Sequence, residues 1–106
     1  MTYEHHTDSR GSQKLEALRA ELDGVDKRLR ETLRERIEIC VRIAEHKREH
    51  AVSMMQPHRI NIVQERAARF ASENQIDQTF IRRFYDLIIE ETCRVEDLVI
   101  AGKEWN

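Results

Sequence analysis

Two basic residues interrupt the apolar side of a long helical pattern. From Leu29, steps of three and four residues reach Arg36, at a position where a buried face would carry a hydrophobic side chain. Lys47 follows eleven residues later, which at 100° per residue places both cations on nearly the same side of a helix, about 16 Å apart along its axis. Long side chains at that separation can share one small ligand. The alternative is that both cations lie at the surface or pair with acidic residues.

A second region has polar side chains on a face that should be apolar. Thr92 and Glu96 follow Ile88 at intervals of four residues. A buried carboxylate is costly unless it pairs with a cation or takes up a proton, and a protonated carboxyl group can donate a hydrogen bond. Two cations, a hydroxyl group and a carboxyl group that face one interior describe a pocket for a small polyanion. The alternative is a structural pairing of Glu96 with Arg36 or Lys47.

Arg19 gives a geometrical indication of a second chain. It precedes Arg36 by 17 residues, which is about 25 Å along a helix axis and about 100° around it. Arg19 therefore cannot reach the same small ligand within its own chain. If it belongs to a binding site, an antiparallel second subunit completes that site most easily, which predicts a dimer.

The elements that must position these residues are helices. The chain has 106 residues, enough for one domain, and it contains only three Gly and one Pro, so turns and strands have little to be built from. Apolar spacing predicts a first helix from Ser12 to about His50, roughly 55 Å long, which a compact monomer of this size cannot cover. Pro57 suits the first turn of a second helix that runs to about Glu73, and Asp77 is a good N-cap for a third.

The predicted fold class is therefore all-α. Each chain has three helices, long, short and long, and two chains form an intertwined homodimer of six helices. Residues 1–11 are polar without apolar periodicity, which predicts a disordered tail, and residues 12–106 form the helical domain.

Composition excludes several classes of partner. The 18 basic and 20 acidic residues give a net charge of −2, which provides no uniform field for nucleic acid or anionic lipid. No apolar stretch of about 18 residues and no signal peptide is evident, so we expect a cytoplasmic protein that binds neither nucleic acid nor a membrane. Cys40 and Cys93 lie in helical stretches and are expected to be reduced.

No metal site is predicted. His46 and His50 are spaced i and i+4, but no third ligand is evident and the HExxH pattern is absent. His5 and His6 lie in the tail without neighbouring ligands. We expect these histidines to be solvated.

Several linked segments resemble the all-helical (AroQ-class) chorismate mutases from Leu15 to about Ile100. They are Leu15 to Arg19, Arg34 to Arg36, the turn that contains Lys47, Arg59, and Phe84 to Glu90. The resemblance implies a dimer of three-helix chains with two equivalent sites. It also implies a Claisen rearrangement of chorismate to prephenate without metal, cofactor or covalent intermediate.

The resemblance also implies a role for each matching residue. Arg36 would bind a carboxylate of the dicarboxylate substrate, assisted by Arg19 from the other subunit. Lys47 would bind the side-chain carboxylate and the ether oxygen, to which Glu96 would donate a hydrogen bond. Thr92 matches a hydroxyl position near the ring carboxylate.

The expected ring pocket departs from the family pattern. Arg59 would support the far end of the ring, but Ile60 stands where many members have a Glu that holds the C4 hydroxyl group, and Gln56 preserves one polar contact. The segments 54–59 and 93–97 are similar to mutases of antibiotic pathways that rearrange 4-amino-4-deoxychorismate. Chorismate and this amino analogue both remain open as substrates.

Two further readings stand beside the mutase. The apolar residue at Ile60 also resembles isochorismate-pyruvate lyases, although Gln would match them better than Glu96 does. A non-catalytic helical dimerisation module is the alternative of a different class. Such a module would place Leu or Ile at Arg36 and at the polar positions of the third helix.

Overall fold

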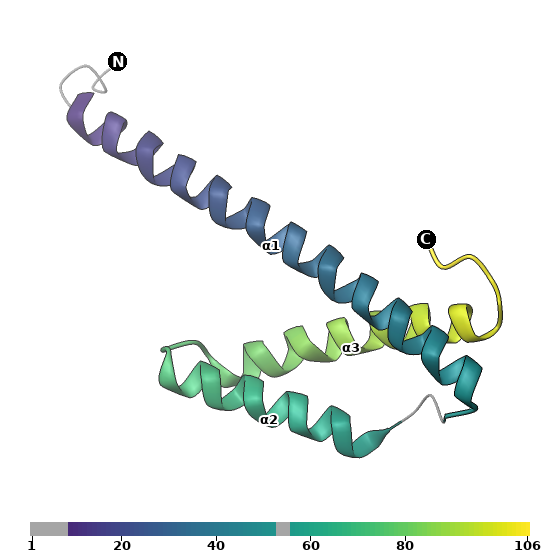
Figure 1. The fold of residues 1–106 in the computed structure, drawn as a ribbon. Helices are drawn as coiled ribbons and strands as arrows, with labels where there is room; N and C mark the ends of the chain where they lie inside the picture. The colour runs from purple at the N-terminus through teal and green to yellow at the C-terminus, as the bar shows by residue number, and fades with distance from the viewer. Residues whose placement is uncertain (1–8, 53–55) are drawn as a thin grey trace. The chain divides into compact units, whose positions relative to one another are not determined.

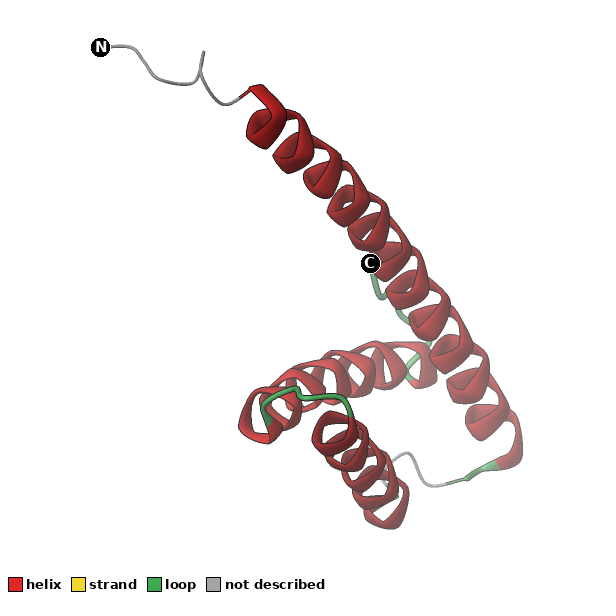
Figure 2. Ribbon diagram, turned by 90° about the vertical axis from the view of Figure 1, so that its left-hand side faces the viewer, coloured by secondary structure: helices red, strands yellow, loops and turns green. Residues whose placement is uncertain are grey.

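The computed structural model describes residues 9–52 and 56–106, and the regular elements in these ranges are three helices (Figure 1). They are α1 (Ser9–His50), α2 (Pro57–Glu73) and α3 (Gln78–Ile100). The prediction of a long, a short and a long helix is confirmed, and Figure 2 shows helix and connecting loop in the described ranges. Residues 1–8 of the predicted tail, together with Met54 and Met55, lie outside the described residues.

Helix α1 begins three residues earlier than its apolar spacing predicts. Ser9 to Gly11 were assigned to the tail because they show no apolar periodicity, yet they are helical. Extending an existing helix costs far less than nucleating one, so exposed polar residues can continue α1 without an apolar stripe. At its other end, Lys47, Arg48 and His50 lie in the last turn, where basic side chains suit the partial negative charge of the helix terminus.

The chain divides into two units, residues 1–36 and 37–106. In the first unit, the described side chains from position 10 to 35 are exposed, except for half-buried Gly24. The apolar stripe of this part of α1 is 44% to 57% exposed, at Leu15, Leu18, Leu22, Val25, Leu29 and Leu33. The described part of the first unit thus has an apolar helical face and no core of its own.

In the second unit, α2 lies beside α3, and small side chains allow the two helices to approach closely (Figures 1 and 2). Ala67, Ala68 and Ala71 are the buried residues of α2. The Gln64 side-chain amide donates a hydrogen bond to Asp86 Oδ1 at 2.7 Å across the pair. These contacts hold α2 along α3.

The starts of α2 and α3 follow the predicted local rules. Pro57 opens α2, where its missing N–H group removes no helical hydrogen bond. The side chain of Asp77 caps α3 by accepting a hydrogen bond from the Phe80 backbone N–H group at 2.8 Å. Local sequence therefore sets where both helices begin.

The core of the second unit lies between the last turns of α1 and the C-terminal half of α3. Ala44, Val95 and Val99 are buried there, and the partly buried residues Ile37, Val41, Ile100 and Trp105 pack against them. Phe84 and Ile88, nearer the start of α3, are half-buried. No helix in the described ranges is long and apolar enough to span a bilayer.

Candidate active site

An ion pair joins α1 to α3 inside the second unit. Lys47 Nζ donates a hydrogen bond to Glu96 Oε1 at 3.2 Å, and the two side chains are only 13% and 10% exposed. Lys47, one of the two cations considered as structural partners for Glu96, is in contact with it. Because little water screens the pair, its charges act more strongly on a bound ion than surface charges would.

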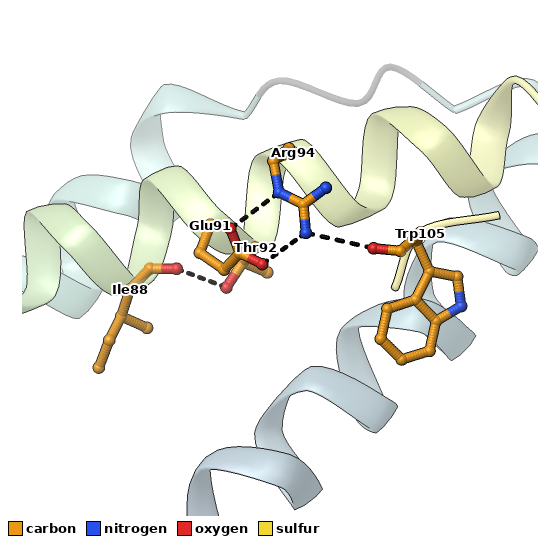
Figure 3. A network of polar contacts seen from close by, with 5 residues as sticks. All are labelled: Ile88, Glu91, Thr92, Arg94 and Trp105. Carbon is orange, nitrogen blue, oxygen red and sulfur yellow. Dashed lines mark hydrogen bonds and ion pairs between the residues drawn. The ribbon is translucent and has the colours of Figure 1, made fainter. Parts of the chain in front are cut away.

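The α3 face that carries Glu96 is polar where its spacing requires burial. Thr92 and Glu96 are 7% and 8% exposed, so the prediction that both occupy the buried face is confirmed. The Thr92 hydroxyl group donates a hydrogen bond to the Ile88 carbonyl oxygen, one turn earlier, at 2.6 Å (Figure 3). This bond aligns the hydroxyl oxygen on the same face as the Glu96 carboxylate, since residues four apart are neighbours on a helix.

Apolar packing and a second basic residue hold Lys47 in place. Ala44 is fully buried one turn before Lys47, and its small side chain allows α1 to contact Val95 and Val99 of α3. Arg48, the next residue on α1, donates a hydrogen bond from Nη1 to the Val99 carbonyl oxygen at 3.0 Å. The last turns of α1 are therefore fixed to α3 on both sides of the ion pair.

The charges of the site act on a neighbouring thiol. Burial raises the pKa of Cys93, and the negative charges of Glu96 and Asp97 raise it further, while Lys47 lowers it. Neither Cys40 nor Cys93 is in a disulfide, as predicted. The response of Cys93 to both members of the ion pair places its thiol within the same electrostatic environment.

The remaining predicted residues of the second unit lie at the start of α2. Gln56 and Arg59 are exposed, and Ile60 is half-buried. The backbone N–H groups of Arg59 and Ile60 donate to the Gln56 carbonyl oxygen at 3.0 and 3.3 Å, so these three residues form one helical turn. Their side chains are grouped by this turn, but their role towards a substrate remains a prediction.

Arg19 and Arg36 belong to the first unit. Arg19 pairs with Glu16 at 3.1 Å, and both side chains are well exposed. Arg36 is half-buried at the end of the unit. Their participation in one site with Lys47 and Glu96 also remains a prediction.

Two features of the second unit were not predicted from the sequence. One is the hydrogen bond from Arg48 to α3, since the sequence pattern does not distinguish Arg48 from the other basic residues in the last turn of α1. The other is Trp105, which packs against the core and accepts a hydrogen bond at its carbonyl oxygen from Arg94 Nη2 at 3.2 Å (Figure 3). A large apolar residue shortly after a glycine that ends a helix is the signal that could have indicated the second feature.

The described residues contain no group of three or more side chains that could hold a metal ion. The His46 and His50 rings stack with their centroids 4.1 Å apart, and His50 Nδ1 lies 2.9 Å from the His46 carbonyl oxygen. These two exposed histidines therefore contact each other within the last turn of α1.

The arrangement suits electrostatic chemistry on a small anion. A mostly buried ammonium group, a carboxyl group and a hydroxyl group lie on facing surfaces of two helices. Fixed charges in a site with little water can stabilise charge that develops during a reaction, without a covalent step.

Comparison with known proteins identifies the family. The family model for chorismate mutase type II matches residues 18–97, most of the chain. A 4-amino-4-deoxychorismate mutase of Streptomyces venezuelae is 52% identical over 87 residues, which cover 82% of this chain and 84% of the relative. A protein of the same name from Streptomyces pristinaespiralis is 55% identical over 88 residues, which cover 83% of this chain and 68% of the relative.

No solved structure matches the chain significantly. The family model and both relatives confirm the resemblance to the all-helical mutases, and they favour a mutase over a lyase or a non-catalytic module. The chain belongs to the chorismate mutase type II family and is an isomerase of that kind.

Proposed function

We propose that this mutase rearranges 4-amino-4-deoxychorismate to 4-amino-4-deoxyprephenate. The observation that carries the proposal is the mostly buried Lys47–Glu96 pair, which supplies a cation and a hydrogen-bonding carboxyl group on facing helices. The choice of the amino substrate is supported by two relatives of that name at 52% and 55% identity.

The chemistry assigned to the pair follows from how charge moves in the rearrangement. The C–O bond breaks ahead of C–C bond formation, so negative charge develops on the enolpyruvyl oxygen. An ammonium group fixed at that oxygen binds the transition state more strongly than the ground state. Lys47 fills this role, and Glu96 donates a hydrogen bond to the same oxygen when its carboxyl group is protonated.

The other residues bind and orient the substrate. Arg36 binds one carboxylate together with Arg19 of a second subunit, and Thr92 lies at the ring carboxylate. Clamping the flexible side chain of the substrate removes rotational freedom before the barrier is crossed. No general base and no cofactor enters this scheme.

The C4 end of the ring lies at the first turn of α2, with Arg59 beside it. Ile60 is half-buried and offers no acceptor for a C4 hydroxyl group. Gln56, exposed one turn earlier, has an amide oxygen that can accept a hydrogen bond from a C4 amine. Ile60 stands where many members of the family have a Glu that holds the C4 hydroxyl group. This difference supports an altered C4 substituent in the substrate of this chain.

The working form that we propose is an intertwined homodimer with two shared sites. The apolar stripe of the first unit, from Leu15 to Leu33, is at least 44% exposed at every position. Apolar surface of this extent is stabilised when a second copy covers it. An antiparallel copy would also bring its Arg19 to the site of the first chain, where it supports substrate binding.

Chorismate is the second candidate substrate. The same pair of charged residues serves its rearrangement equally well, because the reacting enol ether is identical in the two molecules. The family match supports this candidate, and only the first turn of α2 argues against it.

Turnover of separate substrates tests the proposal. Purified protein is incubated with 4-amino-4-deoxychorismate, chorismate and isochorismate, and products are identified by chromatography. We expect the amino substrate to give the highest kcat/KM, and its rearrangement to be lost in Lys47→Ala and Arg36→Ala. Exposed Arg69→Ala on α2 is the matched control for removal of a basic side chain. Failure to convert any of the three compounds would refute the proposal, and a preference for chorismate would favour the second candidate.

A further inference from the structure

The chain beyond α3 turns back on the helix instead of continuing away from it. Ala101 caps α3, and Gly102 follows with φ of 76°, a left-handed conformation that glycine adopts without strain. The Gly102 N–H group donates to the Val99 carbonyl oxygen at 3.0 Å, and that of Lys103 donates to the Leu98 carbonyl oxygen at 2.8 Å. This is the hydrogen-bond pattern of a Schellman motif, which ends a helix and reverses the direction of the chain.

The reversal brings Trp105 to the core that supports the ion pair. Trp105 is partly buried and packs against the cluster of Ala44, Val95 and Val99. On α1, Ala44 is one turn before Lys47, and on α3, Val95 and Val99 lie on either side of Glu96 in the sequence. Trp105 therefore packs against residues that are close in sequence to Lys47 and Glu96 on the same two helices.

A polar anchor holds this segment in place. Arg94 donates two hydrogen bonds to the Glu91 carboxylate, at 2.9 and 2.7 Å, and these bonds lower the pKa of Glu91. The same guanidinium group donates to the Trp105 carbonyl oxygen at 3.2 Å. Figure 3 shows Arg94 between these two partners, with the indole ring on the far side of the Trp105 backbone. Arg94 is thereby oriented from one side and fixes Trp105 on the other.

We propose that Trp105 is a positioning residue of the mutase, which keeps water from the Lys47–Glu96 pair and holds α1 against α3. This inference rests on the proposed function of that pair. Its physical basis is that a charge stabilises a developing negative charge more strongly where water is excluded. Trp105 acts through the pair and makes no contact with the substrate in this proposal.

Separate measurement of kcat and KM tests the role. We expect Trp105→Ala to lower kcat roughly tenfold and to change KM by less than about twofold, because the cationic binding groups remain while their environment becomes wetter. Trp105→Phe keeps an aromatic ring and should restore most of the rate. Lys103→Ala, in the same segment and exposed, is the matched control and should behave as the unmodified protein.

An unchanged kcat in Trp105→Ala would overturn the inference, as would a loss that Trp105→Phe does not recover. Far-UV circular dichroism establishes that each variant is folded. If the unmodified chain converts none of the three substrates, the proposed function fails before any variant is compared, so the two failures are distinguishable.

The fluorescence of this residue gives a readout that does not depend on turnover. Trp105 is the one tryptophan of the 106 residues, so all tryptophan emission reports on this segment. We expect iodide to quench Arg94→Gln more strongly than the unmodified protein, because the anchor is lost. Arg69→Gln, which removes an exposed basic side chain of α2, is the matched control and should be quenched like the unmodified protein. Equal quenching in Arg94→Gln and the unmodified protein would contradict the anchoring of Trp105 by Arg94. This fluorescence measurement also keeps the inference testable if Trp105→Ala does not fold.

Discussion

Lys47 Nζ lies 3.2 Å from Glu96 Oε1, and this pair connects the last turns of α1 to the C-terminal half of α3. Both residues are assigned to the chemistry of the site, so each must satisfy two requirements. They must be stable together in the folded chain, and they must separate far enough for Lys47 to meet an anionic substrate.

The first prediction concerns stability. Lys47→Ala leaves the Glu96 carboxylate buried without this partner, and we expect it to lower the free energy of unfolding by about 3 kcal/mol. The double variant Lys47→Met, Glu96→Leu removes both charges and fills the space, so it should be close to the unmodified protein in stability. Urea unfolding at one fixed protein concentration measures both changes. The double variant should be folded and inactive, and a double variant less stable than Lys47→Ala would contradict this account.

The second prediction concerns pH. If Glu96 donates a hydrogen bond to the ether oxygen, it must be protonated in the working complex, and kcat should fall as pH rises. Glu96→Gln donates at every pH, so its profile should be flat. Steady-state rates from mildly acid to alkaline pH test this, and a flat profile in the unmodified protein would rule out the donor role.

Much of the fold could be predicted from the sequence because it is locally encoded. The apolar spacing, Pro57 and Asp77 were sufficient to place three helices, and steps of four residues were sufficient to place Thr92 and Glu96 on a buried face. These features depend on helix periodicity and on capping, which act over a few residues.

The partner of Glu96 could not be chosen in this way. Arg36 and Lys47 lie on nearly the same side of one predicted helix, and the contact of Lys47 with Glu96 depends on tertiary packing at Ala44 and Val99. The return of Trp105 to the core was missed for the same reason. It depends on a left-handed Gly102 and on a surface formed by two helices, neither of which a periodic pattern describes.

The third prediction concerns the reactivity of Cys93. Burial and the neighbouring carboxylates raise the pKa of its thiol, so less thiolate is present at a given pH than in the unfolded chain. Alkylation by iodoacetamide should therefore be slower than for a free thiol at pH 8 and should increase only at higher pH. Because the unfolded chain releases this proton first, the contribution of Cys93 to stability is present below the unfolded pKa and is lost as pH rises further.

Cys93→Ala is the control that assigns the measured thiol, since Cys40 is not in a disulfide either. Peptide mass mapping of the alkylated protein separates the two positions. Alkylation of Cys93 at the rate of a free thiol would contradict the effect of its surroundings.

The fourth prediction concerns Gly102. Its φ of 76° is unfavourable for residues with a Cβ atom, although no atom lies within 4 Å of the position where Cβ would be placed. Gly102→Ala should therefore lower stability by roughly 1 kcal/mol through backbone strain alone. Asn tolerates the left-handed region better than Ala does, so Gly102→Asn should lower stability by less than Gly102→Ala. Thermal unfolding ranks the variants, and equal losses for Ala and Asn would contradict a conformational cause.

The last prediction tests whether Arg19 serves the site of the other subunit. Arg19→Ala and Arg36→Ala should each be inactive as separate proteins. If they are unfolded together, mixed and refolded, a heterodimer has one site with Arg19 and Arg36 both intact and one site that lacks both. Random reassortment should then restore about a quarter of the unmodified activity, because half of the dimers are mixed and each has one working site.

A mixture of Arg36→Ala with Lys47→Ala provides the control for this experiment. These two residues are assigned to the same chain, so each site of the heterodimer lacks one of them and no activity should return. Size-exclusion chromatography with light scattering establishes that dimers have formed in both mixtures. Recovery of activity in both mixtures, or in neither mixture, would contradict the assignment of Arg19 to the partner's site. Activity should return only where both substitutions fall in the same site of the mixed dimer, which leaves the other site intact.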